Sequence, residues 1–178
     1  MPSLDLCDEF QLEESELQSL IFLAGYVGHK VCSNKVSCES CKLELVSDRT
    51  LQYDLATEHF DYLLSIDRGG LKWPTDLLVE IVTQGYLVFK AVMSKNFERL
   101  FLQRANHKRI LHKLITARLL ACGSVSGECT CGASILQLTH YCLFPLCNIF
   151  LNNYCKRASD LNKCNKSKTS RKLKTLKK

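Results

Sequence analysis

Residues 67–74 read Asp67-Arg68-Gly69-Gly70-Leu71-Lys72-Trp73-Pro74, and this stretch divides the chain into two parts. It holds the only tryptophan and the only Gly-Gly pair of the sequence. The two glycines allow positive φ angles, Pro74 disfavours the α region at Trp73, and Thr75 can cap a helix that begins directly afterwards. The stretch therefore predicts a hinge, pinned by a buried indole, between a polar front and a long apolar-periodic back.

The composition indicates one globular domain, because the chain has 178 residues, of which 46% are hydrophobic and 24% charged. The first sixteen residues carry six acidic residues and no basic one, and no apolar run approaches the length of a membrane span. We therefore expect a soluble, intracellular protein without a membrane partner. In that setting the eleven cysteines are expected to be thiols or metal ligands rather than a disulfide framework.

Charge is segregated along the sequence. Residues 1–89 hold 6 Lys or Arg against 15 Asp or Glu, whereas residues 90–118 hold 8 basic residues and one acidic residue, and residues 156–178 hold 10 and one. The pattern suggests that a polyanion such as nucleic acid contacts the positive parts. A solvated helix face followed by a disordered tail explains the same charges equally well.

Helical periodicity predicts most of the secondary structure. Apolar residues at helical spacing predict one helix of about twenty residues that ends near Val31 and a second directly after Thr75. A third helical stretch follows and breaks near Asn106. A last helix is predicted over residues 135–154, which Pro145 should kink or divide. Residues 51–66 fit a short helix, and residues 43–46 fit either a short extended segment or the first turn of a helix. Residues 123–132 are predicted to be a loop from their composition. No sheet is predicted.

These patterns predict a mostly α, bundle-like single domain. An acidic segment (1–16) precedes the helical domain (17–156), which contains the hinge at 67–74. A basic tail (157–178) follows, which we expect to be disordered alone because it has little apolar surface to bury.

Cys38-x-x-Cys41 is the strongest chemical signal, because two thiolates at this spacing supply half of a tetrahedral zinc site. Cys32 is a nearby candidate for the remainder. Farther along the chain, the candidates are Cys129, Cys131, His140 and Cys142. Because Cys-x-Cys is a less usual zinc spacing, one cysteine of that pair together with His140 is the favoured completion. The predicted structural zinc ligands are Cys38, Cys41, Cys129 and His140, and unliganded thiols are the alternative.

The basic residues suggest contacts with DNA phosphates. Such contacts supply affinity without reading sequence, and they weaken with salt. A hydrated helix face and a nuclear-signal tail are the simpler alternatives. The candidate DNA-binding residues are Arg99, Arg104, Lys108, Arg109, Lys113, Arg171 and Lys172.

Catalytic motifs are missing from the sequence: it has no G-x-S-x-G, H-E-x-x-H, Walker or G-x-G-x-x-G pattern. Carboxylates for two-metal chemistry would have to come from acids such as Glu13, Glu14 and Glu16 together with Asp54, Asp61 or Asp67. Surface acids explain these residues more simply.

Four motifs in order resemble one family. They are Leu23-Ala24-Gly25-Tyr26-Val27 with Lys30, Cys38-x-x-Cys41, Asp67-Arg68-Gly69-Gly70-Leu71-x-x-Pro74, and Leu146-Cys147-Asn148-Ile149-x-Leu151-Asn152-Asn153-Tyr154. The resemblance is to the C-terminal region of P-element-type transposases, which include the THAP-domain transposases.

The resemblance implies the end of an RNase H-like region followed by a helical C-terminal domain. Complete members cut and join DNA with three carboxylates and Mg²⁺, and the two catalytic aspartates would lie upstream of Met1. Whether the third carboxylate falls within Glu9 to Glu16 stays open, so no catalytic residue is assigned. The expected role is a truncated or domesticated, non-catalytic nuclear portion of a transposase that contacts DNA or other transposase subunits.

Two alternatives remain beside this reading. The chain could complete an active site that another chain supplies, or it could be a zinc-organised nuclear interaction module that does not bind DNA.

Overall fold

The computed structural model describes residues 12–47, 73–94 and 106–175, and the side chains of these residues as far as Lys156. The described part contains five helices and one two-stranded sheet. The helices are α1 (Glu14–Asn34), α2 (Glu39–Leu45), α4 (Asp76–Val92), α6 (His107–Ala121) and α7 (Ile135–Thr175). The predicted mostly α fold is therefore confirmed.

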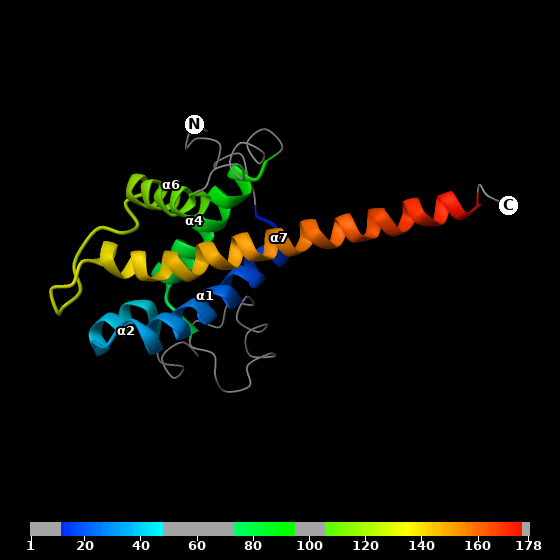
Figure 1. Ribbon diagram of the computed structural model, residues 1–178. Helices are drawn as coiled ribbons and strands as arrows, with labels where there is room; N and C mark the ends of the chain where they lie inside the picture. Colours follow the sequence, from blue (N-terminus) through cyan, green and yellow to red (C-terminus); the bar gives the residue numbers. More distant parts are fainter. Residues whose placement is uncertain (1–11, 48–72, 95–105, 176–178) are drawn as a thin grey trace.

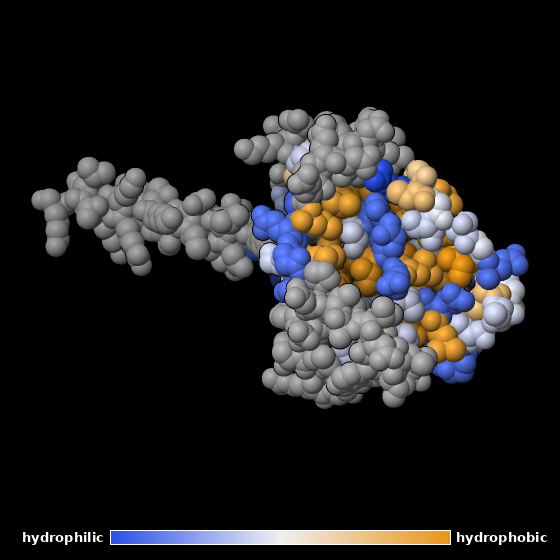
Figure 2. All heavy atoms as spheres, turned by 180° about the vertical axis from the view of Figure 1, so that it is seen from behind, coloured by the Kyte–Doolittle hydropathy of each residue, from blue (hydrophilic) through white to orange (hydrophobic). Residues whose placement is uncertain are grey.

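One hydrophobic core joins α1, α4, α6 and α7, which Figure 1 shows packed side by side. Each helix contributes the residues that its apolar spacing marks, and the members that are fully buried include Val27, Leu78, Ile81, Leu111, Ile115, Leu143 and Leu146. On the side drawn in Figure 2, hydrophobic residues also reach the surface beside bands of hydrophilic ones. Burial of the shared core is the main source of stability for helices of this length.

Of the predicted hinge at residues 67–74, the structure describes only the last two residues. Trp73 and Pro74 form strand β2 (Trp73–Pro74), which pairs antiparallel with β1 (Val46–Ser47). Trp73 is 9% exposed and packs against Ile21, which confirms the expected buried indole. The Gly-Gly turn at residues 69–70 and the predicted helix at 51–66 lie outside the described residues. The small sheet was not predicted, because two-residue strands carry no periodic signal.

Thr75 starts α4 in the manner that the sequence predicts. Its hydroxyl oxygen accepts a hydrogen bond from the backbone N–H of Leu78 at 3.4 Å. The hydroxyl also lies 2.7 Å from the carbonyl oxygen of Glu44, to which it donates. The residue thus caps α4 and ties it to the end of α2.

Helix α7 differs from its prediction at Pro145, which was expected to kink or divide it. Pro145 does not divide it, and the helix runs to Thr175. Buried residues on both sides of the proline, Leu143 and Leu146, hold the adjoining turns against the core. Residues 146–175 contain no glycine or proline and many good helix formers, and Figure 1 shows this end of the helix leaving the body. Among the described residues, no helix is both long enough and apolar enough to cross a membrane.

Candidate metal centre and basic helix face

Three cysteine sulfurs meet where α2 approaches the loop between α6 and α7. The Sγ atoms of Cys38, Cys41 and Cys131 all lie within 4.8 Å of one another, and those of Cys41 and Cys131 are 3.2 Å apart. Figure 1 shows α2 and this loop at the same end of the body. All three cysteines are free thiols. A group of converging sulfurs is the donor set that soft and borderline metal ions such as Zn²⁺ prefer.

The first half of the group is formed by the start of α2. Cys38 is the residue that precedes this helix. The backbone N–H of Cys41, followed by the thiol of Cys131 and the backbone N–H of Ser40, lowers the pKa of Cys38 to about 7. Its sulfur is therefore prepared to act as a thiolate, the form that binds metals.

The second half is a tight turn in the loop after α6. Glu128 and Ser134 form an antiparallel bridge, and the N–H of Gly132 donates to the carbonyl of Cys129 at 2.8 Å. Gly132 has a φ angle of +84°, which a residue with a side chain rarely adopts. Within this turn, the backbone N–H of Cys131 is the main cause that lowers the pKa of Cys129. The turn thus repeats the arrangement at the start of α2, with a backbone N–H that stabilises a thiolate.

The sulfurs cannot all be negative at once without a cation. The thiol of Cys131, burial and the thiol of Cys129 together raise the pKa of Cys41 above its usual range. Cys129 is itself buried and interacts with both Cys131 and Cys41. Cys129, which was predicted to be a ligand, therefore adjoins the group of Cys38, Cys41 and Cys131 without being one of its three converging sulfurs. A metal cation bound by the group would remove the repulsion that raises the pKa of Cys41.

His140 lies elsewhere, although it was predicted to be a ligand. It is outside the three-cysteine group, its Nδ1 is 3.4 Å from Nε2 of His112, and the two rings stack with centroids 5.0 Å apart. Because α7 begins at Ile135, its rotation turns His140 toward α6, which spacing alone could not reveal. Cys131 takes part instead, and the signal that favours it is the glycine directly after it, which permits the tight turn.

The other two candidates from the sequence, Cys32 and Cys142, are buried. Burial is the first cause that raises the pKa of Cys142 to about 12.

The basic face of α6 forms the second candidate site. Arg109 and Lys113 are exposed one turn apart, while Leu111 and Ile115 on the other side are fully buried. Arg118, in contrast, donates from Nε to the side-chain oxygen of Gln84 at 3.0 Å. The exposed pair is thus a rigid, solvent-facing positive surface.

The remaining predicted DNA-binding residues are spread along the chain. Lys108 is half-buried, with its ammonium 3.7 Å from the centre of the Phe144 ring. Arg171 and Lys172 belong to the last turns of α7, and Arg99 and Arg104 fall outside the described residues. The structure therefore brings Lys108, Arg109 and Lys113 together on α6 and does not join them to the other four.

Comparison with known proteins gives one family. Residues 8–124 match the model of the C-terminal domain of the DNA transposase THAP9. Neither the curated proteins nor the solved structures gave a match. The matched region contains α1, α2, α4 and α6 with Cys38 and Cys41, and it ends before Cys131 and α7. It covers well over half of the chain, which agrees with the resemblance seen in the sequence motifs. The chain therefore belongs to the family of THAP9-type DNA transposase C-terminal domains.

Proposed function

We propose that this chain acts as a non-catalytic C-terminal portion of a P-element-like DNA transposase, truncated or domesticated, and contributes DNA or subunit contacts during transposition in the nucleus. The observation that carries the proposal is the basic face of α6. Arg109 and Lys113 are exposed, and the sequence of α6 contains no acidic residue. A rigid helix that presents only positive charge to solvent is suited to contacting the DNA backbone.

The contacts expected from this face are non-specific. Arginine and lysine that reach phosphate oxygens fix a protein on the duplex but do not distinguish bases. The proposed role is therefore to hold DNA or neighbouring subunits in place, and not to select the transposon ends.

A salt titration of duplex DNA binding tests the role of α6. We expect the logarithm of the affinity to fall linearly with the logarithm of the salt concentration, by about 0.9 for each phosphate contacted. Lys113→Gln should lower the magnitude of the slope by about 1, because it removes one phosphate contact. Fluorescence anisotropy with a labelled duplex measures both effects.

Lys42→Gln is the matched control for this titration. The Lys42 ammonium is already paired with Glu39 at 2.6 Å, so its loss should leave the slope nearly unchanged. An affinity that does not depend on salt, or equal effects of the two substitutions, would contradict the role assigned to α6.

The non-catalytic part of the proposal is supported by the acids at the start of α1. Glu13 and Glu16 form a reciprocal capping box, and the Glu16 carboxylate accepts hydrogen bonds from Tyr86 at 2.8 Å and Lys90 at 3.0 Å. A carboxylate held in this way has a structural task. We expect the purified chain to show no Mg²⁺-dependent DNA cleavage, and strand cleavage by the chain alone would contradict this part.

The metal in the proposal is a structural zinc ion bound by the cysteine group. Such an ion would join α2 to the loop before α7 and would contribute directly to folding. Metal analysis of protein purified without added metal should give about one equivalent of zinc, and less than about a tenth of an equivalent would contradict the site.

Two single substitutions make the zinc test specific. Cys38→Ser should lose the metal and lower the melting temperature, because it removes one ligand of the site. Cys155→Ser changes an exposed thiol on α7, far along the sequence from the group, and should retain both. Equal zinc content in the two variants would show that the metal binds elsewhere.

The alternative of a zinc-organised interaction module has one observation in its favour, the exposed hydrophobic Leu43 on α2 beside the cysteine group. The two experiments distinguish the roles. Zinc binding together with no affinity for DNA at low salt favours the interaction module, whereas zinc binding with salt-dependent DNA affinity favours the transposase role.

A further inference from the structure

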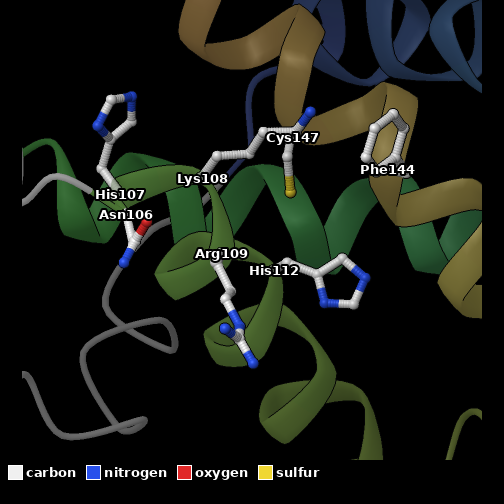
Figure 3. A pocket seen from close by; sticks show the side chains of 7 residues that line it. All are labelled: Asn106, His107, Lys108, Arg109, His112, Phe144 and Cys147. Carbon is white, nitrogen blue, oxygen red and sulfur yellow. The ribbon is translucent and has the colours of Figure 1, made fainter.

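Phe144 lies on the outside of a helix whose neighbouring residues form the core. Leu143 and Leu146 are fully buried, whereas Phe144 is 61% exposed. The ammonium of Lys108 lies 3.7 Å from the centre of its ring, and Figure 3 shows the Lys108 side chain reaching from α6 toward α7. A cation above the ring covers one of its two faces. The exposed fraction shows that much of the remaining ring surface faces solvent.

Two pockets meet at Phe144, and it is the one residue that lines both. The first, of about 460 Å³, lies between α6 and α7, where Lys108, Arg109 and His112 contribute to it. The second, of about 510 Å³, lies between α1 and α7 and includes Lys30, Lys35 and Tyr141. Each has room for a planar group of the size of a nucleobase with its sugar.

The walls of the two pockets are also in contact through a pair of histidines. His112 lines the first pocket and His140 the second, and their rings stack with centroids 5.0 Å apart. Burial, followed by electrostatic interaction with His140 and with the Lys108 ammonium, lowers the pKa of His112. The two pockets with Phe144 between them, called the Phe144 platform, thus form one surface that crosses α6, α7 and α1.

The chemistry of the platform is positive and apolar. Lys30, Lys35, Lys108 and Arg109 stand around it, and no acidic side chain of the described residues lines either pocket. Amides from Asn34 and Asn148 add donors and acceptors to the second pocket. An occupant should therefore carry negative charge together with a flat ring that can stack on Phe144.

We propose that the Phe144 platform binds unpaired nucleotides of a DNA strand, with a base stacked on Phe144 and the flanking phosphates near Lys30, Lys35, Lys108 and Arg109. Aromatic rings in a basic groove bind single strands in this way, because every base presents a π face and every linkage a phosphate. In duplex DNA the bases are stacked on one another and cannot reach the ring. The inference rests on the proposed DNA-binding function and extends it from duplex backbone to unpaired strands.

The decisive comparison uses the full chain and two labelled probes, an oligothymidylate of about twelve nucleotides and an abasic strand of the same length. Stacking predicts that the oligothymidylate binds more tightly, although both carry the same phosphates. Phe144→Ala should lower the affinity for the oligothymidylate about tenfold and leave the affinities for the abasic strand and for duplex DNA nearly unchanged. Phe144→Trp should retain the binding of the oligothymidylate.

Leu120→Ala is the matched control, because Leu120 is a 54% exposed apolar residue of α6 that lines neither pocket. It should not change the binding of any probe, and circular dichroism of Phe144→Ala should match that of the parent chain. Equal affinity for the abasic strand and the oligothymidylate would overturn the inference, as would a Phe144→Ala variant that binds all probes as the parent does.

The test also separates this inference from the proposed function. If duplex DNA binds in a salt-dependent way but Phe144→Ala does not change the binding of the oligothymidylate, the inference about the Phe144 platform is wrong and the proposed function stands. If the chain binds none of the DNA probes, both the inference and the proposed DNA-binding function are wrong.

Discussion

Trp73 is the residue whose removal should cost the most among those the sequence singles out. Its indole is 9% exposed and packs on Ile21 of α1. Trp73→Ala should lower the free energy of unfolding by roughly 3–5 kcal/mol, because it leaves a cavity where a large ring was buried. Urea denaturation followed by far-ultraviolet circular dichroism measures the loss, since the variant has no tryptophan fluorescence.

An exposed aromatic residue provides the comparison for Trp73. Phe144→Ala removes a ring that is 61% exposed and should change the free energy of unfolding by no more than about 0.5 kcal/mol. A cost below about 1 kcal/mol for Trp73→Ala would contradict the burial of the indole.

Residue-level chemistry was predictable from sequence where a local pattern determines it. Cys38 and Cys41 form a motif of four consecutive residues, which can be recognised without knowing the fold. The helix start at Thr75 was likewise expected from a local pattern. His140 was assigned to the metal and lies against His112 instead, because a ligand role depends on the direction in which a helix points its side chains. The contact of Lys108 with Phe144 joins α6 to α7 and has no local signal at all.

At the scale of elements, the start of α4 depends on one hydroxyl. Thr75 accepts the N–H of Leu78 and donates to the carbonyl of Glu44. Thr75→Ala should lower the free energy of unfolding by about 1–2 kcal/mol, since helix caps of this kind contribute that amount. Chemical denaturation measures the change in the free energy of unfolding, and hydrogen exchange of the first turn of α4 shows whether the loss of stability occurs there.

Thr75→Ser retains the hydroxyl and tests the same element by rescue. It should restore most of the stability that Thr75→Ala loses. If both variants lose the same stability, the methyl group of Thr75 is responsible and the cap is not.

Helices α1, α4 and α6 were predictable because their apolar residues repeat at helical spacing over several turns. The pairing of β1 with β2 was not, since each strand has two residues and their partners are separated by more than twenty positions. The continuity of α7 also escaped prediction. Pro145 is a local signal for a break, whereas burial of Leu143 and Leu146 against the other helices is a tertiary effect that overrides it.

At the scale of the whole molecule, one charged contact links the beginning of the described chain to α4. The Glu16 carboxylate is 24% exposed and lies 3.0 Å from the ammonium of Lys90. Burial by itself would raise the pKa of Glu16, but the hydrogen bonds from Tyr86 and Lys90 outweigh it, and the pKa of this carboxyl is lowered. The folded state therefore favours the charged form of Glu16.

This shift has a defined sign in the pH dependence of stability. Because the folded pKa of Glu16 is below the unfolded value of about 4.3, its contribution is complete above that value and is lost as the pH falls through the folded pKa. Glu16→Gln should flatten the stability curve in this acidic range by less than about 1 kcal/mol, since solvent screens a partly exposed pair. Thermal melts between about pH 3 and about pH 7 measure the effect, because this range includes the pH at which carboxyl groups titrate.

Glu128→Gln is the control for this pH dependence, because Glu128 is exposed and its only described contact is the backbone bridge to Ser134. The curve of this variant should follow that of the parent chain. If Glu16→Gln also follows the parent, the contact with Lys90 contributes nothing measurable to stability.

The cysteine group joins parts of the chain that are 90 positions apart, and this separation sets the order in which a growing chain can complete its fold. Translation adds about 5–20 residues per second, so Cys38 and Cys41 emerge from the ribosome roughly 5–20 s before Cys131. During that interval they offer half of a tetrahedral ligand set, which holds a metal only weakly. Firm capture of the proposed ion would therefore require that synthesis has passed the turn before α7.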